Sequence, residues 1–181
     1  MFTGGTDNDA GFPNQGALNK QINLEFSASY TYLGMALYMD AVHLSGFASW
    51  MVAQSDEERT HARRLLRYML DRNGDVELNS IPKPKVDYGS VKEVFEASLE
   101  QERNNTQSIN SLYALANELD DYATQAHLKW FLDEQVEEEK SVTDILGRLE
   151  LAGEDKTAIL ILDQALSERS GGSDALSIVD H

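Results

Sequence analysis

The sequence predicts an all-α fold: a four-helix bundle with one long crossover and a short fifth helix at its C-terminal end. The 181 residues include only three prolines and long stretches of Ala, Leu, Glu, Gln and Arg, a composition that favours helices. Apolar residues recur at steps of three and four along four long segments, which is the spacing of one helix face. The connections run short, long, short, as expected for a bundle with a single crossover.

The first two helices are predicted from about residue 15 to about 43 and from 45 to about 72. Ser45-Gly46 marks a short break between them, and Asn73-Gly74-Asp75 is a strong stop signal. The segment 74–89 has no helical period and contains two prolines. It is long for a loop in a compact domain, so we expect it to cross the length of the bundle.

The second pair of helices follows this crossover. Ser90 and Glu93 have the spacing of a capping box and predict a helix that reaches about residue 119. Asp120-Asp121 is expected to cap a fourth helix that ends near Gly153. We therefore divide the chain into a flexible tail over 1–14, a helical domain over 15–168 and a loose tail over 169–181.

A fifth helix is predicted over 155–168, which is too short to be stable alone. We expect it to dock against something outside the bundle. A symmetric interface with copies of the chain would bury its apolar stripe, which consists of Ile159, Leu160, Leu162 and Leu166.

Composition restricts the classes of partner. Lys and Arg number 15 against 31 Asp and Glu, giving a formal net charge of -16, which argues against nucleic acid and anionic membranes as partners. The absence of cysteine excludes disulfides and thiolate metal sites. No apolar stretch approaches the length of a membrane span, and no basic-then-apolar export signal opens the sequence. We expect a soluble, cytoplasmic protein, or a plastid protein if the source is algal.

Polar residues interrupt all four predicted apolar seams at about mid-length. An unpaired buried carboxylate is strongly destabilising, so something cationic must compensate for these acids. A pair of metal ions is our interpretation, and a buried polar network is the alternative. The seam residues that could serve metal ions are Glu25, Glu58, His61, Glu102, Gln135 and Glu138.

This set has the composition of a di-iron site. Iron prefers carboxylate oxygens with one or two imidazoles, and helical di-iron proteins combine single glutamates with Glu-x-x-His pairs. Glu58-x-x-His61 supplies a bridging carboxylate and the imidazole, while Glu25 and Glu102 are the single acids. One Glu-x-x-His alone is weak evidence, but four inward positions at matching depth are specific.

The metal-capable residues lie in four segments, which are QINLEFSASYTYL (21–33), QSDEERTHARRL (54–65), LEQERNNTQSI (99–109) and FLDEQVEEEK (131–140). In this order they resemble the metal-binding segments of non-haem ferritins, and the resemblance covers nearly all of residues 15–168. It implies an iron-storage ferritin that oxidises Fe(II) with O2 at a ferroxidase centre. It also implies storage of Fe(III) mineral in a hollow shell of twenty-four identical subunits.

The resemblance also implies residue roles. Glu25, Glu58 and His61 would form the first iron site, and Glu58 and Glu102 the second, with Glu58 bridging. Gln135 matches a glutamine beside the irons of animal heavy-chain ferritins. The resemblance places Glu138 as an extra carboxylate at the second site.

Further residues match other features of the family, beyond the two iron sites. Glu57, Glu134 and Glu137, together with Glu138, resemble a third iron site near the inner surface, and a solvated acidic helix face is the alternative. Tyr32 resembles the tyrosine beside the di-iron centre, although a plain core tyrosine would look the same. The ring of Trp130, which matches a tryptophan of some bacterial ferritins, is expected to be a buried bundle aromatic.

The positions at which the sequence departs from known ferritins indicate which branch of the family it resembles. Arg59 stands where bacterioferritins have a haem-binding methionine, and the second Glu-x-x-His is missing, so we expect no haem. Gln125 and Leu128 occupy the places of the acids that line the iron-entry channels of animal ferritins. The fifth-helix segment DKTAILILDQAL resembles cyanobacterial and algal ferritins.

Two other functions remain open at this point. A dimeric di-iron oxidase or peroxidase would share the site, but such proteins keep two Glu-x-x-His motifs and need no fifth helix. A shell subunit without catalysis would share the fold, but the set of metal-capable residues here is intact.

Overall fold

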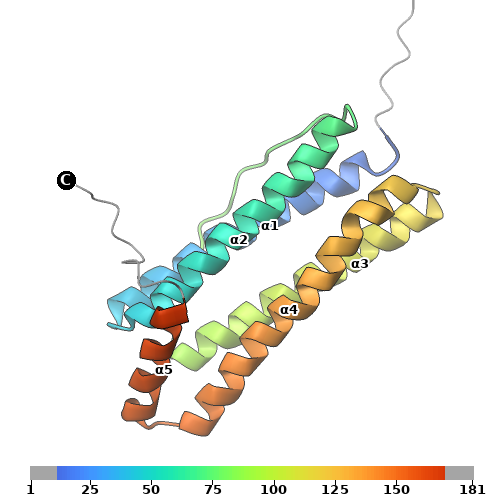
Figure 1. The fold of residues 1–181 in the computed structure, drawn as a ribbon. Helices are drawn as coiled ribbons and strands as arrows, with labels where there is room; N and C mark the ends of the chain where they lie inside the picture. Colours follow the sequence, from blue (N-terminus) through green and yellow to red (C-terminus); the bar gives the residue numbers. More distant parts are fainter. Residues whose placement is uncertain (1–11, 170–181) are drawn as a thin grey trace, which may run out of the picture.

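The computed structural model describes residues 12–169, which form five α-helices and no strand in that range (Figure 1). The predicted fold class, four long helices with one crossover and a short fifth helix, is confirmed. The bounds lie within two residues of the predicted ones. They are α1 Gln15–Ala41, α2 Ser45–Asp71, α3 Val91–Glu118, α4 Tyr122–Ala152 and α5 Lys156–Arg169.

The bundle consists of two helical hairpins, α1 with α2 and α3 with α4 (Figure 1). Two apolar clusters fill the core towards its two ends, one containing Phe47 and Phe95 and the other Leu65 and Phe131. The six metal-capable residues predicted in the four seams are all buried. The polar seam residues therefore lie between two apolar clusters that exclude water from both sides.

The α1–α2 hairpin is held closely at the level of these polar residues by a pair of serines. Ser29 Oγ donates to the Ser55 carbonyl at 2.7 Å, and Ser55 Oγ donates to the Ser29 carbonyl at 2.8 Å. The two small side chains let the helices approach while their hydroxyls remain satisfied.

Side-chain amides of α1 hold the crossover along that helix. Asn19 donates to the Asp75 carbonyl at 2.8 Å and accepts from the Glu77 amide at 2.9 Å. Asn23 repeats this one turn later, donating to the Glu77 carbonyl at 2.7 Å and accepting from the Asn79 amide at 2.7 Å. The crossover thus has hydrogen-bond partners without being a strand.

The predicted caps of α3 and α4 are present. Ser90 Oγ accepts from the Glu93 amide at 3.1 Å, while Glu93 accepts from the Gly89 amide at 2.7 Å rather than from that of Ser90. Asp121 accepts from the Thr124 amide at 3.2 Å and caps α4. Both acids serve helix starts, where backbone N–H groups lack partners.

The expectation that the fifth helix docks outside the bundle is wrong. α5 packs across the end of the chain's own bundle, with Leu162 and Leu166 buried beside α2 and α4 (Figure 1). Asp163 Oδ1 accepts from the Phe47 amide at 2.8 Å and so caps α2 from another helix. Of the predicted stripe, Leu160 is 57% exposed.

Residues 12–14 also pack on the bundle, although the sequence placed them in a flexible tail. Asn14 is buried and its Nδ2 donates to Asp121 Oδ2 at 2.9 Å. Residues 1–11 and 170–181, which make up the rest of the two predicted tails, lie outside the described residues. Over residues 12–169, no helix combines the length and the apolarity needed to cross a membrane.

Candidate metal centre

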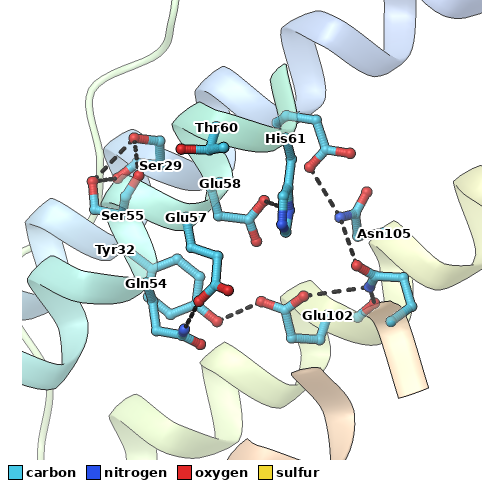
Figure 2. A network of polar contacts seen from close by, with 12 residues as sticks. Ser29, Tyr32, Gln54, Ser55, Glu57, Glu58, Thr60, His61, Glu102 and Asn105 are labelled. Atoms are coloured by element: carbon cyan, nitrogen blue, oxygen red, sulfur yellow. Dashed lines mark hydrogen bonds and ion pairs between the residues drawn. The ribbon is translucent and has the colours of Figure 1, made fainter. Parts of the chain in front are cut away.

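Side chains from all four long helices converge between the two apolar clusters (Figure 2). None of them is more than 6% exposed, because each occupies an inward position of its helix. The structure thus brings together the six residues singled out in the seams: Glu25 from α1, Glu58 and His61 from α2, Glu102 from α3, and Gln135 and Glu138 from α4.

The first group of possible metal ligands is fully buried. One ligand atom each from Glu25, Glu58 and His61 lies within 4.8 Å of the others. Glu58 Oε2 and His61 Nδ1 are 3.4 Å apart, and neither has a hydrogen-bond partner. Buried polar atoms are almost always satisfied, so two facing ligand atoms without partners fit a site for a cation.

Burial raises the pKa of three carboxyl groups of the centre, those of Glu58, Glu102 and Glu138. Burial raises the pKa of Glu58 well above its ordinary value, and the nearby charges of Glu25 and Glu102 raise it further. Burial also raises the pKa of Glu102 to about 7. The pKa of Glu138 rises to about 9 through burial and the charges of Glu57 and Glu102. A divalent cation would compensate these charges and displace the protons.

A second group of ligand atoms lies between α2 and α4. Glu57, His61, Glu134 and Glu138 each place one ligand atom within 4.8 Å of the others. Glu57 and Glu134 are only partly buried, so this group leads from the buried centre towards the surface. Glu137 is exposed and stays outside the group, although its charge contributes to the raised pKa of Glu134.

Tyr32 is tied to the centre from the side of α1. Its hydroxyl donates to Glu102 Oε1 (Figure 2). The same hydroxyl lies 2.9 Å from Ser98 Oγ. Burial raises the pKa of Tyr32 well above its ordinary value, and Glu102 and Glu58 add to that effect. The hydroxyl therefore keeps its proton and acts as a donor to the carboxylate.

Aromatic rings enclose the imidazole of His61. The edge of Trp130 lies against it with centroids 5.4 Å apart, and Phe131 lies at 6.0 Å. Trp130 is only partly buried, and the Arg64 guanidinium covers its ring at 3.9 Å from the centroid. These contacts restrict the orientation of His61 in the centre.

Two buried amides that the sequence pattern did not predict also belong to the centre. Gln21 Nε2 donates to Glu25 Oε1 at 2.8 Å, and Asn105 Nδ2 donates to Glu25 Oε2 at 3.1 Å. Gln21 lies four residues before Glu25 and Asn105 three residues after Glu102. Helical spacing was therefore the signal that could have found them.

The residues at which the sequence departs from its family lie away from the centre. Arg59 is exposed and pairs with Asp56 at 2.7 Å. Leu128 is fully buried in the core and so cannot line a channel, while Gln125 donates to Asn117 at 3.0 Å.

The topology and the convergent carboxylates define a helical bundle protein of the ferritin-like class. The family model described as ferritin-like domain matches residues 15–152. The chain therefore belongs to the ferritin family.

Named relatives agree with this assignment. The chain is 40% identical over 154 residues to a bacterial non-heme ferritin of Staphylococcus epidermidis. It is 38% identical over 154 residues to that of Staphylococcus aureus. Both alignments cover 85% of this chain and 93% of the relative.

Solved structures show the same fold. An open-pore ferritin of the hyperthermophilic archaeon Archaeoglobus fulgidus aligns with a TM-score of 0.84 and 42% identity, covering 85% of this chain and 94% of that one. A form of the Archaeoglobus fulgidus ferritin engineered to be closed aligns with a TM-score of 0.85 and 40% identity, covering 88% and 97%.

Proposed function

We propose that this protein is an iron-storage ferritin whose bundle oxidises Fe(II) with O2 and whose assembled shell stores the Fe(III) product. The observation that carries the proposal is the pair of buried, unpartnered ligand atoms on Glu58 and His61. They lie at the only level of the described bundle where acids from all four long helices meet. Iron is the substrate here, and its own redox chemistry supplies the electrons.

The residues have separate tasks in this proposal. Glu25 and His61 bind one Fe(II), Glu102 and Glu138 bind the other, and Glu58 bridges the two. Four carboxylates favour Fe(III) over Fe(II) because the higher charge balances more of theirs. His61, enclosed by Trp130 and Phe131, fixes the direction of the nitrogen ligand.

The group between α2 and α4 is proposed as a third iron position. Glu57, Glu134 and Glu138 would bind it, with His61 at its edge. Its partial exposure suits an ion that passes between the centre and the shell interior. The exposed Glu137 would flank this path rather than bind.

Two observations support the proposed shell: the chain belongs to the ferritin family, and α5 exposes apolar side chains. Leu160 and Ile161 stay 57% and 65% exposed after α5 has packed on its own bundle. Copies of the chain would cover these side chains in a closed, symmetric assembly. The net charge of -16 would concentrate Fe(II) near an acidic interior.

Rapid mixing tests the oxidation step. The protein is loaded anaerobically with Fe(II), mixed with O2, and followed by absorbance. Glu58→Ala and His61→Ala should abolish the fast phase, because each removes one of the unpartnered ligand atoms. Glu118→Ala, on an exposed position of α3, is the control and should oxidise iron as the parent does.

An unchanged fast phase in Glu58→Ala would overturn the assignment of the centre. If the parent protein shows no fast phase at all, the result would favour the alternative function, a shell subunit without catalysis.

A further inference from the structure

Two side-chain amides occupy both carboxylate oxygens of Glu25. Gln21 Nε2 lies 2.8 Å from Oε1, and Asn105 Nδ2 lies 3.1 Å from Oε2. All three side chains are buried. Both donors are amide N–H groups, so both oxygens of the Glu25 carboxyl group act as acceptors in this arrangement.

The orientations of the two amides depend on each other. Gln21 Nε2 also donates to Asn105 Oδ1 at 2.6 Å, and Gln21 Oε1 accepts from Ser108 Oγ at 2.6 Å. An amide nitrogen has two hydrogens, and Gln21 uses one for Glu25 and one for Asn105. Flipping either amide would point an oxygen at an acceptor, so the arrangement is self-consistent in one orientation only.

The same chain of amides reaches the other side of the centre. Asn105 Nδ2 lies 3.4 Å from Gln135 Oε1 (Figure 2). Gln135 Nε2 in turn donates to the Glu102 carbonyl at 3.2 Å and approaches its carboxylate at 3.4 Å. Three amides therefore connect Glu25 to Glu102 across the bundle.

We propose that Asn105, together with Gln21, is a positioning residue that orients Glu25 as a metal ligand and so sets the affinity of the first metal position. This inference rests on the proposed function. The two amides restrict rotation of the Glu25 carboxylate, and one of its oxygens lies within 4.8 Å of a ligand atom of Glu58 and one of His61. Groups that orient a metal ligand in this way typically change metal affinity about 10–100-fold.

Anaerobic titration of the metal-free protein with Co(II), followed by calorimetry and the visible spectrum, tests this without any oxidation step. Asn105→Leu removes the donor at similar size and should weaken the tighter binding step by about 10–100-fold. Asn104→Leu makes the same change at the neighbouring exposed position and should titrate like the parent. Gln21→Met removes the other donor with little change in shape and should also weaken that step.

The outcomes separate the inference from the proposed function. If Glu58→Ala loses Co(II) binding but Asn105→Leu and Gln21→Met titrate like the parent, the positioning role is wrong and the metal centre stands. Lower melting temperatures with unchanged titrations would also overturn it, because they indicate packing alone. If Asn105→Leu fails to fold, Gln21→Met decides. A parent that binds Co(II) no better than Glu58→Ala would overturn the proposed function itself.

Discussion

Glu58 is the residue at which burial and binding conflict most directly. Glu58 is 2% exposed, one of its carboxyl oxygens has no hydrogen-bond partner, and three other acids act on it. Such a residue destabilises the metal-free bundle, because its carboxyl group is buried among other acids and away from water, and a bound cation would compensate for this cost.

Replacing Glu58 should therefore stabilise the metal-free protein. We expect Glu58→Met, which keeps the volume, to gain about 1 kcal/mol, or about 2–4 °C in melting temperature for a domain of this size. Calorimetric melting in the presence of a chelator measures this. The parent should overtake the variant once a divalent metal is added, and a variant that melts lower than the metal-free parent would contradict the prediction.

Asp121, which lies away from the centre, is a buried acid whose hydrogen bonds outweigh the cost of burial. Burial raises its pKa, but hydrogen bonds from Thr124, Arg72 and Asn14 outweigh burial and lower it to about 2. Because the folded pKa lies below the ordinary 3.8, the ionised group stabilises the fold above about pH 4. This contribution is lost as the pH falls from about 4 towards 2.

Asp121→Asn keeps an acceptor for the cap and removes the charge. We expect the variant to be less stable than the parent by about 2 kcal/mol at pH 7, with the difference closing below pH 4. Urea unfolding at a series of pH values measures this. Asp133→Asn, an exposed change on the same helix, should show no such pH-dependent difference.

At the scale of elements, the contact between α5 and the start of α2 leaves no room for a side chain. A Cβ on Gly46 would lie 1.7 Å from the Asp163 carbonyl oxygen. Gly46→Ala should therefore displace α5, remove the Asp163 cap and lower the melting temperature. Gly147→Ala is the matched control, because a Cβ there meets nothing within 4 Å.

The control should raise stability by up to about 1 kcal/mol, since alanine favours a helix over glycine. Thermal unfolding of both variants, with limited proteolysis to detect a released α5, gives the comparison. Equal melting temperatures for the two variants would show that α5 tolerates the displacement.

The sequence was sufficient to predict the helices and much of the centre. The apolar positions that recur with the helical period are also the positions that become buried, so polar residues among them could be recognised as buried. Glu25, Glu58, His61 and Glu102 were found as polar residues in apolar seams, and all four are buried together. The docking of α5 could not be found this way. Local pattern shows that Leu162 must be covered, but not which surface covers it.

At the scale of the molecule, the centre joins two hairpins. Glu25, Glu58 and His61 belong to α1 and α2, whereas Glu102 and Glu138 belong to α3 and α4. Metal ions bound between them would link the hairpins and stabilise the whole bundle by mass action.

The assembly itself is tested by light scattering. We expect the mass of a closed shell, twenty-four chains by family resemblance, at micromolar concentration and neutral pH. Leu160→Glu and Ile161→Glu place charges on the apolar surface left exposed by α5 and should weaken the assembly. A dimer of the parent protein would contradict the storage function and favour a soluble di-iron oxidase.

The pairing of α1 amides with the crossover has a consequence for solvent exchange. The backbone amides of Asp75, Glu77 and Asn79 each donate to a side chain of α1. Alternate backbone hydrogens of a segment without secondary structure should thus be slowed in deuterium uptake. Their exchange rates should depend on how often the crossover separates from α1. Deuterium uptake at these three amides would therefore measure the stability of the contact between the crossover and α1.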